Sequence, residues 1–112
     1  MAANTIDQVH ENWVAQMFDG HRDPSSGSRW HNRGDVVAPP YLISCKATEK
    51  KSKSISLKDW EEISDQTYER GLTFPVMAYR FLLSDGGLFS PHRVDLVALN
   101  LHDFLELTSG RD

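Results

Sequence analysis

An aspartate and a lysine stand on two neighbouring apolar segments, within the stretch GDVVAPPYLISCKAT. Asp35 opens the segment 35–38, Lys46 lies near the end of the segment 41–47, and Pro39-Pro40 between them predicts a turn. If the segments pair as strands, both side chains lie near one end of a sheet. A carboxylate can hold Mg²⁺, which polarises a phosphate and activates a water molecule that the lysine positions. A surface salt bridge is the simpler explanation of the same pair.

The elements that would position these residues follow from apolar spacing and from capping residues. Thr5 and Gln8 form a capping-box pattern, and the helical spacing after them predicts a helix over 5–19 that stops at Gly20. The order α-β-β-α-β-β-α predicts an α/β fold, with a mixed sheet flanked by helices. The remaining expected elements are a helix from Ser56 to a stop at Gly71, strands at 74–83 and 92–100 separated by a turn at 85–87, and a helix at 101–107.

Length and composition indicate one domain over residues 1–112 with a net charge of −4. A single cysteine excludes an internal disulfide and favours a cytoplasmic setting. No apolar run approaches the roughly 20 residues of a membrane span, and the N-terminus does not resemble a signal peptide, so no membrane partner is expected. Of the five histidines, His10 falls on the apolar side of the first helix and is interpreted as a packing residue.

Positive charge is concentrated in two places although the whole chain is acidic. Residues 21–33 contain three arginines, and residues 46–53 contain four lysines against one glutamate. Because salt screens each local field within about 10 Å, such patches can bind a phosphate backbone despite the net charge. Lysine-rich runs are also common in solvated loops without a ligand. Acidic residues are concentrated elsewhere, with five of the sixteen in the predicted helix at 59–69.

The ordered set of segments resembles the PD-(D/E)XK nucleases, the superfamily of restriction enzymes and archaeal Holliday junction resolvases, and especially its small phage-encoded resolvase-like proteins. The resemblance covers roughly residues 10–83. It implies a restriction-endonuclease-like fold in which a glutamate on the first helix, a serine-containing loop, Gly-Asp-Val-Val and a strand ending in lysine follow one another. The matching segments are HENWVAQMF, DPSSGSRWHNRGDVV, YLISCKATEKKSKSIS, LKDWEEISDQTYERG and FPVMAYRFLL.

Residue by residue, the resemblance implies that Asp35 is the central metal ligand, Lys46 the catalytic lysine and Glu11 a supporting metal ligand. On a helical wheel Glu11 lies near the edge of the apolar stripe, from which it could reach the site or face solvent. The implied cofactor is Mg²⁺, with Mn²⁺ as a substitute. The implied contacts to DNA are Ser26, Ser28, Arg29 and Arg33 before the first strand, and Lys50, Lys51 and Lys53 after the second.

Ser44 departs from the pattern, because the family usually has an acid two residues before the lysine. Its loss should weaken the binding of Mg²⁺, a cation held mainly by charged oxygens. Glu49 could replace the missing acid, or Glu11 and Asp35 could suffice together with the backbone carbonyl of Cys45. A third explanation is that the site is inactive. The Cys45 side chain itself is interpreted as a packing thiol within an apolar strand.

The resemblance therefore implies a structure-selective endonuclease that resolves Holliday junctions or other branched DNA as a homodimer, since a two-fold pair supplies two symmetric nicks. Two other classes of function stay open at this point. The neutral Ser44 would suit a catalytically silent module that binds branched DNA. The net negative charge and the acidic helix at 59–69 would suit a protein-interaction or inhibitor domain.

Overall fold

The computed structural model describes residues 5–23, 35–83 and 92–109 and has the predicted α/β class. The short strand β1 was not predicted, so the order is α-β-β-β-α-β-β-α and the expected α-β-β-α-β-β-α is wrong by one strand. Two residues are too few for an alternating pattern to show in the sequence. In chain order the elements are α1 (Ile6–Met17), β1 (His21–Arg22), β2 (Val36–Ala38), β3 (Tyr41–Thr48), α2 (Leu57–Glu69), β4 (Phe74–Leu82), β5 (Arg93–Ala98) and α3 (Leu101–Ser109).

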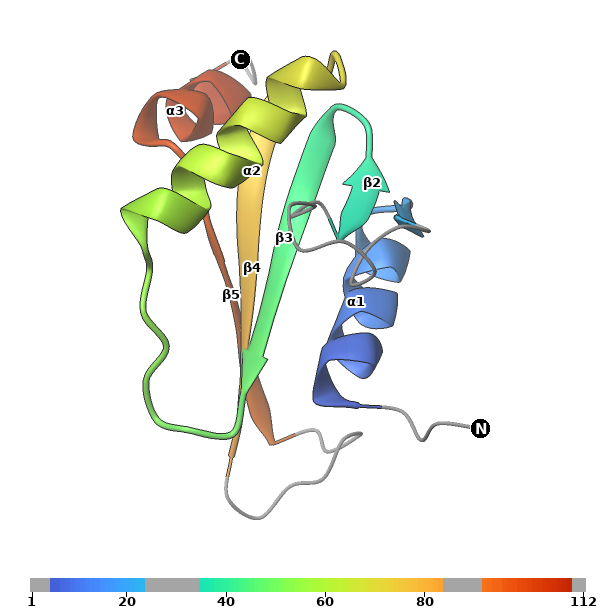
Figure 1. The fold of residues 1–112 in the computed structure, drawn as a ribbon, viewed down its shortest axis with the longest axis vertical. Coiled ribbons are helices and arrows are strands. Elements are labelled where there is room, and N and C mark those ends of the chain that lie inside the picture. The colour runs from blue at the N-terminus through green and yellow to red at the C-terminus, as the bar shows by residue number, and fades with distance from the viewer. Residues whose placement is uncertain (1–4, 24–34, 84–91, 110–112) are drawn as a thin grey trace.

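The five strands form one mixed sheet in the order β1-β2-β3-β4-β5 (Figure 1). The hairpin of β2 and β3 turns at Pro39-Pro40, joined by a cis peptide bond, and pairs Val36 with Ile43. The helix α2 then crosses over so that β4 lies parallel to β3, whereas the other neighbouring strands are antiparallel. The predicted pairing of the two strands that carry Asp35 and Lys46 is therefore confirmed for β2 and β3.

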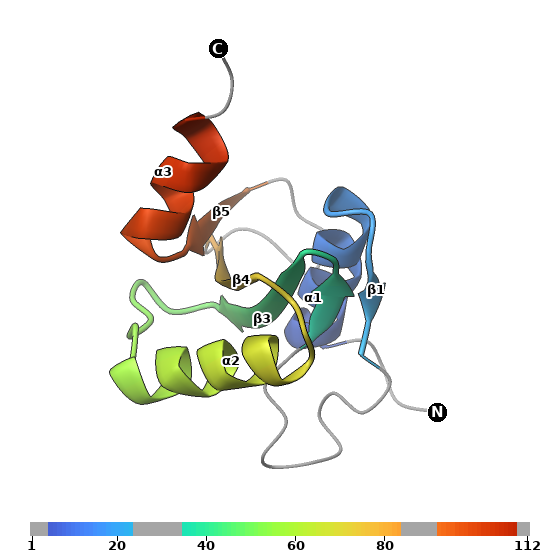
Figure 2. The same cartoon turned by 90° about the horizontal axis from the view of Figure 1, so that it is seen from above.

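The helices α1 and α2 cover opposite faces of the sheet (Figure 2). Ile43 packs in the apolar cluster on the α1 face, and the neighbouring Cys45 contacts the same cluster. Leu42 packs in the other cluster, against Ile63 of α2. Because side chains alternate along a strand, β3 directs its odd-numbered residues towards α1 and its even-numbered residues towards α2.

The two long helices end in different ways. At α1 the capping box is confirmed, and the left-handed residue after the helix is Asp19 with φ of 57°. Gly20, expected to be the stop, instead donates its N–H to the carbonyl of Ala15 and lies against β2. A Cβ at Gly20 would come within 2.5 Å of the carbonyl oxygen of Val37, so this close approach needs glycine. At α2 the stop at Gly71, with φ of 73°, is as predicted.

The sheet is less well covered at its β5 edge. β5 is an edge strand, and α3 follows it without burying any of its own residues. Asn100 caps α3, because its side-chain oxygen accepts a hydrogen bond from the N–H of His102. None of the helices in the described part of the chain has the length and apolar character that a membrane crossing requires.

Candidate active site

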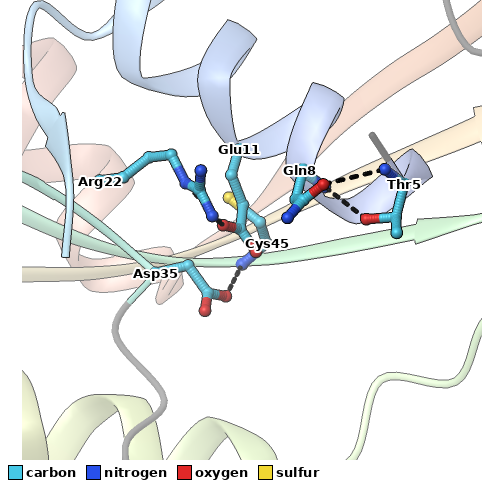
Figure 3. Close-up of polar contacts among 6 residues, drawn as sticks. All are labelled: Thr5, Gln8, Glu11, Arg22, Asp35 and Cys45. Carbon is cyan, nitrogen blue, oxygen red and sulfur yellow. Dashed lines mark hydrogen bonds and ion pairs between the residues drawn. The ribbon is translucent and has the colours of Figure 1, made fainter. Parts of the chain in front are cut away.

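Three elements bring Glu11, Asp35 and Cys45 together (Figure 3). Glu11 comes from α1, Asp35 immediately precedes β2, and Cys45 lies in the middle of β3. The N–H of Asp35 donates to the carbonyl of Ile43 at 2.9 Å, which extends the hairpin ladder by one residue. The carboxylate of Asp35 then accepts a hydrogen bond of 2.7 Å from the N–H of Cys45. Pairing of the two strands therefore fixes where this carboxylate lies.

Glu11 is buried, with only 9% of its surface exposed. Figure 3 shows the carboxylates of Glu11 and Asp35 close to the backbone of Cys45. Burial raises the pKa of the Glu11 carboxyl group, and the negative charge of Asp35 raises it further. Arg22 of β1 opposes this effect by donating from Nε to Oε1 of Glu11 at 3.0 Å, with Nη2 at the same distance. The helix edge on which the sequence placed Glu11 therefore faces the sheet.

Cys45 contributes its backbone to this group, while its thiol packs on the α1 face. Burial raises the pKa of the thiol above its ordinary value, and the charges of Asp35 and Glu11 raise it further, so the sulfur stays protonated and unreactive. This supports the interpretation of the side chain as a packing group. The N–H and C=O of a strand residue point to the same neighbouring strand, so the Cys45 carbonyl also faces the side on which Asp35 lies.

Ser44 and Lys46 lie on the other face of β3, towards α2. Ser44 is buried, with 4% of its surface exposed. The Nζ of Lys46 lies 3.5 Å from a carboxylate oxygen of Asp59, near the start of α2. The same Asp59 raises the pKa of Tyr79, although burial is the larger cause. The predicted lysine side chain therefore lies on the face of β3 opposite to Glu11 and the Cys45 thiol, where it pairs with an acid of α2.

The lysine-rich segment forms an exposed loop between β3 and α2. Glu49, Lys50, Lys51 and Lys53 are all solvent-exposed, as contact with a phosphate backbone requires. The loop starts in an ordered way, because the N–H of Lys50 donates to the hydroxyl of Thr48 at 3.0 Å. Ser26, Ser28, Arg29 and Arg33, the other expected DNA contacts, lie outside the described residues.

The oxygen atoms of this site meet the requirements of Mg²⁺ only in part. The acids Glu11 and Asp35 are neighbours whose repulsion raises the pKa of Glu11, and a bound cation would relieve that repulsion. A carbonyl oxygen such as that of Cys45 is also a suitable ligand type. No group of three or more His, Cys, Asp or Glu residues able to hold a metal occurs within 5–23, 35–83 and 92–109, so Glu49 completes no such group there. The site thus provides two carboxylates.

Two charged partners of the site were not identified from the sequence. Arg22 appeared only as part of a basic segment, and nothing in its spacing connects it with Glu11. Asp59 was noted as part of the acidic helix expected at 59–69, which starts from Ser56. Its N–H does donate to the hydroxyl of Ser56 at 3.2 Å, but its carboxylate faces Lys46. The spacing of a capping box fixes the backbone bond, whereas only the packing of α2 on β3 fixes the direction of the carboxylate.

No protein-family model, curated protein or solved structure matches the chain. The chemistry of the site is therefore argued from its own geometry and from the sequence pattern.

Proposed function

We propose that the chain is a metal-dependent endonuclease with a restriction-endonuclease-like fold that cleaves branched DNA, with a Holliday junction as its substrate. The observation that carries this proposal is the pair of neighbouring carboxylates, Glu11 and Asp35, held beside the backbone of Cys45. Lys46 is the next residue along β3. Two acids that can hold a metal ion, with a long lysine side chain starting from the opposite face of the neighbouring strand, suit hydrolysis of a phosphodiester if the lysine reaches around to the phosphate.

Glu11, Asp35 and the carbonyl of Cys45 would hold Mg²⁺ or Mn²⁺. When bound, such an ion polarises the phosphate and lowers the pKa of a water molecule. The backbone N–H of Cys45 orients Asp35 through the bond of 2.7 Å, so the carboxylate does not have to be ordered during the reaction. Lys46 would leave Asp59 to position the attacking water or to offset charge on the phosphate.

The exposed loop with Lys50, Lys51 and Lys53 would follow the DNA backbone. Phosphate contacts fix position and orientation without reading bases, which suits an enzyme that selects DNA by its shape. Ser26, Ser28, Arg29 and Arg33 would approach the scissile phosphate, as the sequence resemblance implies. Two symmetric nicks would come from two copies of the chain.

The test is incubation of the purified protein with a labelled four-way junction in Mg²⁺ or Mn²⁺. We expect paired nicks that disappear in Asp35→Asn, since this variant keeps the size of the side chain but removes a charged ligand. A matched control is Asp19→Asn, which removes the same charge at the end of α1. Binding without cleavage in both metals would contradict the endonuclease proposal.

A second candidate is a silent module that binds branched DNA on the same fold. It is favoured by the buried Ser44 in place of an acid and by the ion pair of Lys46 with Asp59. If it is correct, the wild-type chain binds the junction without cleavage, and Ser44→Glu creates metal-dependent cleavage. Ser44→Gln is the control of similar size, and melting temperatures show whether either variant still folds.

A further inference from the structure

A small cavity lies on the α1 face of the sheet, between α1 and the strands β4 and β5. Its volume is about 180 Å³. His10, Val14 and Ala78 are buried and form its floor, whereas Val97 is exposed at its rim. The cavity is separate from the candidate active site, because Glu11 pairs with β1 at the opposite edge of the sheet.

The size and the lining of this cavity limit what it can hold. Most of the lining side chains are apolar, and Trp13 and Phe18 of α1 contribute aromatic rings. A protein cavity of about 150 Å³ holds one benzene molecule, whereas sites for drug-sized ligands start at roughly 300 Å³. The cavity therefore suits a single ring with a short substituent and is too small for a nucleotide.

The charged groups beside the cavity already have partners. Asp95 lines it and accepts hydrogen bonds from Nε of Arg80 at 2.7 Å and from Nε of Arg93 at 2.9 Å. Both guanidinium groups also lie over the ring of Trp13, at 4.8 and 5.2 Å from its centre. A charged ligand would lose its hydration without gaining an ion pair here, so the cavity favours a neutral one.

His10 contributes a polar group that lacks a partner. Its side chain is buried, and its Nδ1 accepts or donates no hydrogen bond within the described part of the chain. Buried polar atoms of native proteins nearly always have a partner. Water suits this position poorly, because a buried water needs about three polar contacts and Asp95, which also lines the cavity, is already paired.

We propose that the cavity binds a small neutral aromatic molecule whose hydroxyl or N–H group donates a hydrogen bond to the imidazole of His10. Burial lowers the pKa of His10 to about 4, so at neutral pH the ring is uncharged and one of its nitrogens accepts. The ring of the ligand would pack against Trp13 and Phe18. This binding goes beyond the endonuclease function and needs neither metal nor DNA.

Phenol is the probe, and toluene is its partner of similar shape without a donor. Amide NMR titration of the ¹⁵N-labelled protein gives a dissociation constant for each. His10→Leu should weaken phenol binding about fivefold relative to toluene binding, because only phenol loses a hydrogen bond. The comparison of two probes on one variant cancels any change in the shape of the cavity.

The ring nitrogens of His10 provide a measurement that needs no variant. A long-range ¹H–¹⁵N correlation of the wild-type imidazole should show one nitrogen shifting when phenol is added and neither shifting with toluene. A pair of variants on β5 then tests the location. Val97→Asn should weaken both probes severalfold, since Val97 lines the cavity. Val94→Asn is the matched control, because alternation along β5 directs Val94 to the other face of the sheet.

Phenol binding that shifts a ring nitrogen of His10 and weakens in Val97→Asn but not in Val94→Asn would support the proposal. The absence of a saturable shift at about 10 mM phenol would overturn it, because a ligand of this size binds in the millimolar range. Equal weakening of both probes in His10→Leu would also overturn it. Failure to cleave a junction would leave this result unaffected, so the two proposals fail separately.

Discussion

Burial raises the pKa of Glu11 in α1, and the carboxylate of Asp35, the residue just before β2, raises it further. Each acid makes ionisation of the other less favourable, so the pair is held together by the fold and not by mutual attraction. Arg22 offsets part of this repulsion through its ion pair of 3.0 Å with Glu11. A cation bound at the proposed site would relieve the rest of this repulsion.

The first prediction concerns the coupling of these two acids. Asp35→Asn should lower the pKa of Glu11 towards its ordinary value, because it removes the larger of the two nearby negative charges. Carboxyl-carbon NMR titration of the free protein measures the change. Asp7→Asn is the matched control, since Asp7 raises the same pKa less. A pKa of Glu11 that does not move in Asp35→Asn would show that the acids are not coupled.

The second prediction treats Arg22 as a competitor for the metal. Arg22→Gln should raise the pKa of Glu11 without metal, because the guanidinium and its hydrogen bond both lower it. The same variant should bind Mg²⁺ more tightly, by roughly three- to tenfold if removing one nearby positive charge is worth about 1 kcal/mol. Isothermal titration calorimetry measures the affinity.

Arg70→Gln is the control for this change, because Arg70 pairs with Asp23 at 2.6 Å and its loss changes the net charge equally. Equal Mg²⁺ affinity in the two variants would mean that net charge, and not the contact with Glu11, determines binding.

The third prediction concerns the ion pair of Lys46 with Asp59. Asp59→Asn should release Lys46 and strengthen binding to a four-way junction severalfold, with a salt dependence steeper by about one counterion. Glu61→Gln removes the same charge from an exposed position on the same helix. Filter binding over a range of salt concentrations compares the two variants, and identical slopes would show that Lys46 does not contact phosphate.

Local spacing in the sequence was sufficient to predict most helices and strands, because capping residues and apolar periods act over a few neighbours. Thr5 with Gln8 and the stop at Gly71 are examples in which the structure has the predicted geometry. The strand β1 and the ion pair of Arg22 with Glu11 could not be predicted. Both depend on how the segment after α1 folds back beside β2, and such contacts leave no periodic signal.

The candidate site likewise has some contacts that local sequence predicts and others that only tertiary packing determines. The hairpin predicted that Asp35 would approach β3, and the bond to the N–H of Cys45 follows from that pairing. The direction of Lys46 was not predictable, because Asp59 comes close only when α2 packs across the sheet. Tertiary packing therefore determines the charges around each predicted residue.

The fourth prediction separates two reasons for glycine in this fold. Gly20→Ala should lower the free energy of unfolding by about 2–3 kcal/mol, because its Cβ would overlap the carbonyl of Val37 and the Cβ of Ala38. Gly71→Ala should cost only about 1 kcal/mol, because its Cβ meets nothing within 4 Å and the strain comes from φ alone. Urea unfolding measures both, and equal losses would contradict the close approach of Gly20 to β2.

The fifth prediction is a pH dependence of stability caused by His10. This side chain is 1% exposed, and its Nδ1 has no hydrogen-bond partner among the described residues. Burial lowers its pKa to about 4, helped by the positive charges of Arg80 and Arg93 and opposed by Asp95. Because the unfolded chain binds the proton near pH 6.5 and the folded chain does not, stability is full above that pH and falls as the pH drops towards 4.

Between pH 7 and pH 5 the wild-type protein should therefore lose about 2 kcal/mol more stability than His10→Gln, because the glutamine at position 10 does not titrate. Urea unfolding at the two pH values gives the difference. His102→Gln on the exposed face of α3 is the control and should lose as much as the wild type. If all three proteins lose the same amount, His10 takes up its proton equally well in the folded and unfolded chains, and its burial is not what limits stability in acid.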